Sequence, residues 1–268
     1  MKKLHPLPLA LSLGAAALLQ ACSNAEATPS SVTYLGPNAL VSSVNLLTGA
    51  PTTAGVDAAG KPLVNMVVEI PAGTSQKWET CTTNAAADLA AFPECTGDWK
   101  KRMVLEVKSG KRRVLQHLGY PGNYGSIPMT AGGDGDPLDI VAIGPALERG
   151  TIQAVKVIGV IRCWDLPVTS PLVVDDKVVA IVQETKTAGP DVGLDSPLYP
   201  LVNTISAGAT DDLDAKAPEA TTMLKAWYRN YKGVGKMDCG DLVEDAAAAM
   251  ATIQAAHDAA VAKGAAYP

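Results

Sequence analysis

Short apolar stretches rich in Val, Ile and Leu follow one another along the middle of the chain. Their bounds are 63–73, 77–80, 102–118, 137–144, 154–164 and 177–185. The 102–118 stretch contains Ser109–Gly110 at its centre, which is typical of a hairpin turn. Short β-rich stretches at near-regular spacing predict the strands of a small barrel.

Helical periodicity is confined to the C-terminal part of the chain. Residues 217–233 have Pro218 near the start of a predicted helix, where a missing N–H costs little, and Gly233 just past its end. The apolar side chains that share one face of this predicted helix are Leu224, Trp227 and Tyr231.

A second helix is predicted over residues 241–264, because Asp241 and Glu244 match a capping box and Gly264 follows the last apolar position. The Gly/Pro/Asp-rich residues 186–216 connect the strands to these helices. The pattern therefore predicts an α+β, mainly β domain, with a barrel followed by two C-terminal helices.

The first 22 residues are typical of an export signal. A basic start precedes an apolar stretch that is too short to be a convincing membrane span. The stretch ends in Leu19–Cys22, which resembles a bacterial lipobox and predicts lipidation of Cys22. The alternative is an ordinary secretory signal, cleaved near Ala21 or within Ala25–Ala27.

The small, polar residues 23–60 are predicted to be a tether and irregular lead-in, which leaves 61–268 as the folded domain. Only 4% of the 268 residues are aromatic, so the core must rely on Val, Ile, Leu and Ala. The net charge is −5, and it becomes −7 once residues 1–22 are removed. This charge argues against nucleic acid as a partner.

Three aspartates, Asp134, Asp136 and Asp139, lie within six positions of the segment "DGDPLD". Carboxylates at that density repel one another, and hard divalent cations are their natural partners. A solvated turn is the alternative. An EF-hand fits poorly, because its fifth position should carry an oxygen ligand and is Leu138 here.

Further acids, lysines and tyrosines are found near the ends of the predicted strands, in the order Glu69, Lys77, Glu79, Tyr120, Tyr124, Asp165, Asp175, Lys177, Tyr231 and Lys232. With the motif D-x-D-P-x-D, this series resembles soluble family I inorganic pyrophosphatase over residues 63 to 255. The resemblance implies a five-stranded OB-like barrel with helices packed alongside. It also implies hydrolysis of pyrophosphate to two phosphates with several Mg²⁺ ions per active site.

The resemblance assigns roles by position. Metal ligands would be Asp134, Asp136, Asp139, Asp165 and Asp175, with Glu69 and Glu79 nearby. Substrate ligands would be Lys77, Arg113, Tyr124, Lys177, Tyr231 and Lys232. Asp136 would be the general base, and Asp134, Tyr124 and Lys177 would complete the catalytic set. Counting back from Tyr120 can favour Arg112, but we prefer Arg113 because it leads directly into apolar residues.

The chain departs from the family pattern at Leu166, where an acid is usual, and in a longer loop over 166–174. Additions at 80–100 and 185–217 leave the oligomeric state open between hexamer, dimer and monomer.

Export implies an oxidising compartment, and four cysteines without C-x-x-C spacing favour disulfides. Three pairings are possible. We expect Cys81–Cys95, which brackets one insertion absent from the compact family pattern. The resemblance places Asp165 and Lys232 in one site, and this favours Cys163–Cys239.

Two other functions remain open on the sequence alone. One is a catalytically silent lipoprotein that binds metal or phosphate, and the other is a hydrolase of a larger phosphoanhydride. The expected location is the periplasmic side of a membrane. The outer membrane is favoured because Ser23 and not Asp follows Cys22.

Overall fold

The computed structural model describes residues 31–83, 92–169, 172–183, 194–201 and 213–264. The signal segment, the tether and Cys22 lie outside these residues. Within the described part of the chain, no helix is both long and apolar enough to cross a membrane.

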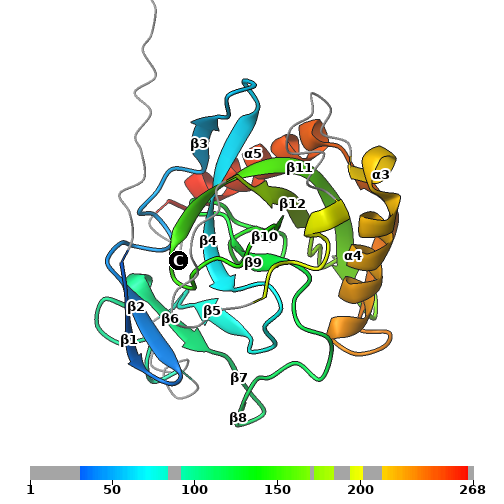
Figure 1. The fold of residues 1–268 in the computed structure, drawn as a ribbon. Coiled ribbons are helices and arrows are strands. Elements are labelled where there is room, and N and C mark those ends of the chain that lie inside the picture. The colour runs from blue at the N-terminus through cyan, green and yellow to red at the C-terminus, as the bar shows by residue number, and fades with distance from the viewer. Residues whose placement is uncertain (1–30, 84–91, 170–171, 184–193, 202–212, 265–268) are drawn as a thin grey trace, which may run out of the picture.

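Five strands form the centre of the molecule (Figure 1). Neighbours pair in the order β4 (Pro62–Ile70), β9 (Asn123–Ser126), β10 (Asp139–Ile143), β12 (Lys177–Val182) and β11 (Ile152–Asp165). Residues 152–156 of β11 also pair with β4, so the pairings run in a ring. The predicted five-stranded barrel is confirmed, although β9 was not predicted.

The barrel sheet is extended at both ends by β3 (Thr53–Val56) and β13 (Met237–Glu244). A second sheet has the order β1 (Val32–Gly36), β2 (Ala39–Ser42), β6 (Arg102–Leu105) and β5 (Trp78–Thr80). A short 3₁₀ helix, η1 (Trp99–Lys101), precedes β6.

The lead-in was predicted to be irregular, and this prediction is wrong for residues 32–56, which form β1, β2 and β3. The segment lacks a strand pattern of its own. Its strands form because β2 pairs with β6 and β3 pairs with β4, partners that lie further along the chain.

The two-stranded hairpin of β7 (Val107–Lys108) and β8 (Lys111–Arg112) projects from the body at the bottom of Figure 1. Its turn has positive φ angles at both Ser109 (53°) and Gly110 (73°), as a type I′ hairpin turn requires. The predicted turn is therefore confirmed.

Helices cover two sides of the barrel. Helix α4 (Pro218–Tyr231), preceded by the short α3 (Leu213–Lys216), packs its buried face against the aromatic side of the core. Helix α5 (Ala246–Lys263) packs against a second cluster of aliphatic side chains from the barrel.

The predicted start of the second helix is wrong. Residues Asp241–Glu244 belong to β13, and Asp245 is the N-cap, its carboxylate accepting from the N–H of Ala248 (2.9 Å). Strand β13 forms because the edge of β11 is available to pair with it. That pairing outweighs a local capping pattern.

Both predicted disulfides are confirmed. Cys81–Cys95 closes a short segment of 14 positions beside β5. Cys163–Cys239 joins directly paired positions of β11 and β13, with Cα atoms 4.0 Å apart. All four cysteines are buried.

Candidate active site

One cavity of about 330 Å³ gathers nearly all the predicted site residues. It is lined by Glu69, Lys77, Glu79, Thr80, Thr82, Lys108, Arg113, Tyr124, Ser126, Asp134, Asp136, Pro137, Asp139, Asp165, Asp175, Tyr231 and Lys232. Of the predicted catalytic, substrate and metal residues, only Lys177 is absent from the lining. It lies beneath the cavity, where its side chain is 0% exposed and contacts Asp139 and Asp175.

The acidic motif lies in a loop between β9 and β10 that is closed at its base. The N–H of Ile127 donates to the carbonyl of Leu138 (2.9 Å), and the hydroxyl of Thr130 accepts from the N–H of Leu138 (2.9 Å). Gly135 has φ +100°, which allows the tight turn between the first two aspartates. The Asp134 carboxylate accepts from the N–H of Asp136 (3.1 Å).

Helix α5 holds this loop from the side. The N–H of Ala131 donates to the carbonyl of Ala256 (2.9 Å), and the Lys263 ammonium donates to the carbonyl of Gly135 (3.2 Å). The Nδ1 atom of His257 lies 2.9 Å from the carbonyl of Met129, whose φ is +59°. The acids of the loop are thus positioned by the last helix of the fold.

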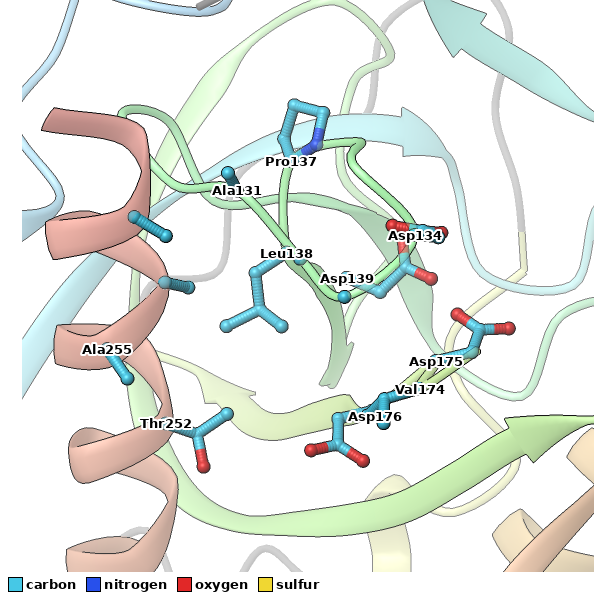
Figure 2. Close-up of a pocket in the computed structure, with 14 residues that line it drawn as sticks. Ala131, Asp134, Pro137, Leu138, Asp139, Val174, Asp175, Asp176, Thr252 and Ala255 are labelled. Carbon is cyan, nitrogen blue, oxygen red and sulfur yellow. The ribbon is translucent and has the colours of Figure 1, made fainter. Parts of the chain in front are cut away.

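A second cavity of about 290 Å³ lies between the acidic loop, residues 174–176 and α5 (Figure 2). Its lining includes Asp134, Asp139 and Asp175, which also line the first cavity, whereas the α5 side consists mostly of alanine. These three carboxylates therefore stand between two hollows.

Lysines pair with the acids at the strand ends. The buried Lys177 contacts Asp139, its partner in the β10–β12 register, and Asp175. Lys232, at the end of α4, contacts Asp165 (2.7 Å) and Asp175 (2.9 Å). Asp175 is thus shared between two ammonium groups.

Burial and mutual repulsion set the charge state of the acids. Burial, and then the neighbouring aspartates, raise the pKa of Asp134 to about 6. Burial also raises the pKa values of Asp136 and Asp139, although Lys177 opposes the effect on Asp139. Burial acts to raise the pKa of Asp175 too, but Lys177 and Lys232 outweigh it and keep that pKa below its ordinary value.

Glu69 is one of the buried acids of the site. Burial raises its pKa to about 7, although its carboxylate accepts from the N–H of Thr80 (3.0 Å) and the hydroxyl of Ser126 (3.4 Å). A buried carboxylate with a raised pKa is poorly stabilised as an anion by its protein neighbours alone. A bound cation would supply that stabilisation.

The donor set fits a hard divalent cation, because carboxylate oxygens from several elements meet at one cavity and their charges are incompletely balanced. As they stand, no three acidic, histidine or cysteine side chains among the described residues form a ready coordination group. The lysine contacts account for this in part, since Lys177 and Lys232 engage oxygens of Asp139, Asp165 and Asp175.

Two cations that line the cavity share one acid. Arg113 donates to both oxygens of Glu106 (2.7 and 3.1 Å), and Lys77 lies 3.3 Å from the same carboxylate as well as contacting Glu79. The guanidinium of Arg112 pairs instead with Glu94. Only Arg113 of this pair lines the cavity, as the preferred alignment requires.

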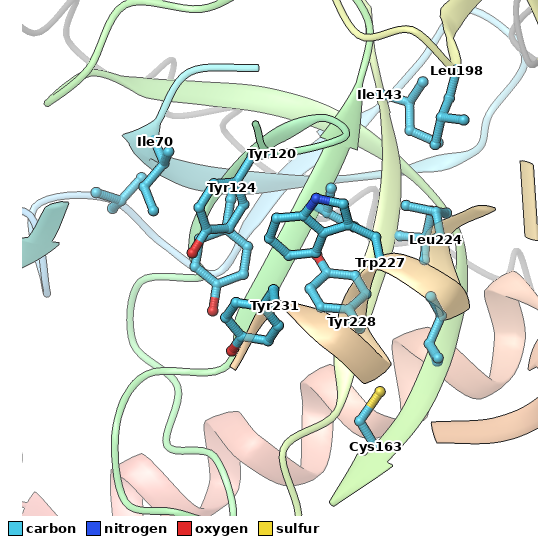
Figure 3. Close-up of a cluster of buried hydrophobic side chains, with 14 of the residues drawn as sticks. Ile70, Tyr120, Tyr124, Ile143, Cys163, Leu198, Leu224, Trp227, Tyr228 and Tyr231 are labelled. Carbon is cyan, nitrogen blue, oxygen red and sulfur yellow. The ribbon is translucent and has the colours of Figure 1, made fainter. Parts of the chain in front are cut away.

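An aromatic cluster backs the cavity (Figure 3). Tyr120, Tyr124, Trp227, Tyr228 and Tyr231 pack with ring centroids 4.6 to 6.4 Å apart. Burial raises the pKa values of Tyr124 and Tyr231 well above the ordinary tyrosine value. Both hydroxyls therefore stay protonated and can donate hydrogen bonds at the cavity surface.

Several residues that line the cavity or contact its lining were not predicted as site residues. Ser126, which helps to hold Glu69, lies on β9, a strand that the sequence pattern did not predict. Glu106 links Lys77 to Arg113, and the only available signal was its position at the start of a predicted hairpin. Lys108 carried no signal beyond its charge.

Comparison with known proteins gives one consistent family. A family model described as "Inorganic pyrophosphatase" matches residues 66–261. Proteins named "Inorganic pyrophosphatase" from Schizosaccharomyces pombe and Yarrowia lipolytica are 32% identical over 187 residues and 30% identical over 191 residues. Each alignment covers 65% of this chain and 54% of the relative. The chain thus spans about half the length of the curated relatives it matches.

Solved structures agree on the fold. The type I inorganic pyrophosphatase of Toxoplasma gondii has a TM-score of 0.62 at 24% identity, with 87% of this chain and 98% of that chain covered. A Trypanosoma cruzi vacuolar soluble pyrophosphatase, truncated of its N-terminal domain and solved in complex with PPi, has a TM-score of 0.62 at 19% identity. That comparison covers 98% of each chain. Likeness at these identities shows a shared fold.

Proposed function

The chain belongs to the inorganic pyrophosphatase family, and from this premise we propose that it hydrolyses pyrophosphate to two phosphates with the help of Mg²⁺. One observation carries the proposal. A single cavity brings seven carboxylates, suited to divalent cations, together with lysine, arginine and tyrosine donors suited to phosphate. A cavity with both kinds of group can bind a phosphoanhydride together with its metal ions, whereas a site for a metal ion alone or for phosphate alone would need only one kind.

The acids that would hold the metal ions are Asp134, Asp136, Asp139, Asp165 and Asp175, with Glu69 and Glu79 nearby. Bound divalent cations lower the pKa of water and neutralise charge on the attacking and leaving oxygens. The pKa of about 6 at Asp134 is in keeping with this role, because a cation would relieve the repulsion that raises it.

Asp136 is the best-placed general base. Within the described structure neither Asp136 nor Asp134 forms an ion pair, whereas Asp139, Asp165 and Asp175 each contact a lysine. Asp134 accepts a hydrogen bond from the N–H of Asp136, whereas the Asp136 carboxylate accepts none from the described residues. Its side chain can therefore accept the proton that the attacking water loses as its oxygen bonds to phosphorus. The bond from that phosphorus to the bridging oxygen breaks, and the second phosphate leaves.

The remaining groups orient the substrate. Lys77 and Arg113 are set side by side by Glu106, so their donors form a fixed pair for phosphate oxygens. The protonated hydroxyls of Tyr124 and Tyr231 add neutral donors. Lys232 exchanges carboxylate contacts for phosphate contacts as negative charge arrives, whereas the buried Lys177 holds Asp139 and Asp175 in place beneath the cavity.

Phosphate release from pyrophosphate, measured on the full chain with Mg²⁺, tests the proposal. Asp136→Asn preserves volume and should lower turnover by about 10²–10⁴-fold. Asp258→Asn on the exposed side of α5 is the matched control and should behave as wild type. Undiminished turnover in Asp136→Asn would refute the assignment of the base.

The same assay separates the rival functions. A silent binding protein would bind Mg²⁺ and imidodiphosphate in calorimetry without releasing phosphate. A hydrolase of larger phosphoanhydrides would have a higher kcat/KM for ATP or tripolyphosphate than for pyrophosphate.

Export and lipidation at Cys22 belong to the proposal as well. The "LQAC" segment of residues 19–22 supports them, as do two disulfides in a chain with five cysteines, since disulfides persist in oxidising compartments. The proposed location is the periplasmic side of the outer membrane, with the N-terminal lipid as anchor. Self-association is the other partner interaction to test, by sedimentation of the mature chain.

A further inference from the structure

The β7–β8 hairpin places an additional cation at the cavity. Lys108, the last residue of β7, is exposed and lines the cavity together with Lys77 and Arg113. We propose that the hairpin forms a third phosphate-binding position, so that the site also accepts linear inorganic tripolyphosphate. The inference rests on the proposed pyrophosphatase function and names a further substrate for the same cavity.

The charge pattern of the hairpin supports an anionic ligand. Lys108 pairs directly with Lys111 across the two strands, so both side chains lie on the same face. Like charges at directly opposed positions destabilise a strand pair. Among the described residues, neither lysine forms an ion pair with an acid, so the repulsion is not balanced within the hairpin. A bound phosphate would balance it.

The acid nearest to Lys108 in the sequence does not neutralise it. Glu106 lies two positions before it, but its carboxylate is already shared between Arg113 and Lys77. The three cations Lys77, Lys108 and Arg113 are thus accompanied by two acids, Glu79 and Glu106, so this cluster keeps one positive charge. A substrate with one more phosphate than pyrophosphate carries the additional negative charge that the cluster can accept.

The base of the hairpin is fixed relative to the rest of the cavity. The N–H of Glu106 donates to the carbonyl of Lys77 (2.9 Å), and the N–H of Lys77 donates to the carbonyl of Arg113 (3.1 Å). The N–H of Arg113 in turn donates to the carbonyl of Glu106 (2.7 Å). Lys108 is thus attached by a short, hydrogen-bonded strand to the two cations proposed to hold pyrophosphate.

The test compares Lys108→Met with Lys216→Met, which removes the same charge from an exposed position of α3 outside the cavity. The quantity measured is kcat/KM for tripolyphosphate divided by kcat/KM for pyrophosphate, with Mg²⁺ at fixed ionic strength. Loss of one charge-assisted contact to the third phosphate should lower this ratio about tenfold in Lys108→Met. Lys216→Met should leave the ratio at the wild-type value.

Three results would overturn the inference. Wild-type protein that hydrolyses pyrophosphate but neither hydrolyses nor binds tripolyphosphate would refute it and leave the proposed function intact. An equal loss on both substrates in Lys108→Met, abolished by salt, would show that Lys108 only steers anions. An unchanged ratio in Lys108→Met would show that the hairpin makes no contact.

Calorimetry keeps the two proposals separate. If the wild type releases no phosphate from pyrophosphate, the proposed function fails. Tripolyphosphate binding in the presence of Mg²⁺ would then still support the third position, provided that Lys108→Met weakens it about tenfold more than it weakens imidodiphosphate binding. Equal weakening would overturn the inference in that case too.

Discussion

Removing the two disulfides separately should destabilise the protein to different extents. The Cys163–Cys239 bridge spans 76 positions, whereas Cys81–Cys95 spans 14. In the chain-entropy treatment, closing these loops stabilises the fold by about 4.5 and about 3 kcal/mol respectively at 25 °C. The double variant Cys163→Ala/Cys239→Ala should therefore lose about 1.5 kcal/mol more free energy of unfolding than Cys81→Ala/Cys95→Ala.

The comparison is well matched, because all four cysteines are buried and each variant removes the same two sulfur atoms. The packing loss is therefore similar in the two variants, and the difference isolates loop length. The free energy of unfolding would be measured by urea denaturation of the two variants and the wild type, under oxidising conditions. Coincident fluorescence and circular dichroism transitions would establish that unfolding is two-state.

An equal or larger loss in the Cys81→Ala/Cys95→Ala variant would refute the loop-entropy reasoning. Reducing the wild type beforehand opens the same two loops. If neither variant is then less stable than the reduced wild type, the loop-entropy reasoning is supported. Unpaired thiols in the oxidised wild type, found by peptide mapping, would contradict the bridges themselves.

Three further predictions concern metal, pH and lipid. Turnover of pyrophosphate should be lost in EDTA, restored by Mg²⁺ and inhibited by Ca²⁺, whose looser coordination activates water poorly; full activity in EDTA would exclude a metal-dependent site. In metal-free protein, burial raises the pKa of Glu69 to about 7 from an ordinary value of 4.5. Between these two values the folded state binds more protons than the unfolded state, so the free energy of unfolding falls as the pH rises. In EDTA, the free energy of unfolding of the wild type should therefore drop between pH 5 and pH 8, and in Glu69→Gln this drop should be smaller by up to about 3 kcal/mol. The same drop in the variant as in the wild type would contradict the raised pKa. Cys22→Ser should release the mature chain from membranes, whereas a wild-type chain that begins beyond Cys22 in mass spectrometry would indicate the ordinary secretory signal.

The acidic loop could be predicted from the sequence because its chemistry is local. Asp134, Asp136 and Asp139 fall within six positions, and Pro137 and Gly135 mark a turn between strands. Their mutual repulsion is a consequence of spacing alone. The structure adds the loss of surrounding water and the approach of Asp175, which contribute to raising the pKa of Asp134 and which spacing does not determine.

Contacts between distant segments could not be predicted in the same way. Lys232 reaches Asp175 across 57 positions, and only the packing of α4 against the barrel brings them together. The early strands are similar, since β2 forms by pairing with β6, about 60 positions later. Asp241–Glu244 matched a helix start locally but was incorporated into a sheet edge. In each case tertiary pairing decided the outcome.

The attachment of the acidic loop to α5 imposes an order on the maturation of the protein. Residues 127–138 are synthesised more than a hundred positions before Ala256 and His257, which hold them. Until α5 docks, the loop lacks its contacts with Ala256, His257 and Lys263, and it is held by its internal hydrogen bonds and by contacts such as the bond from the N–H of Met129 to the carbonyl of Leu47. A chain still emerging from a ribosome or a translocation channel would therefore be inactive. Recovery of catalysis during refolding would lag behind barrel formation and would report the docking of the last helix.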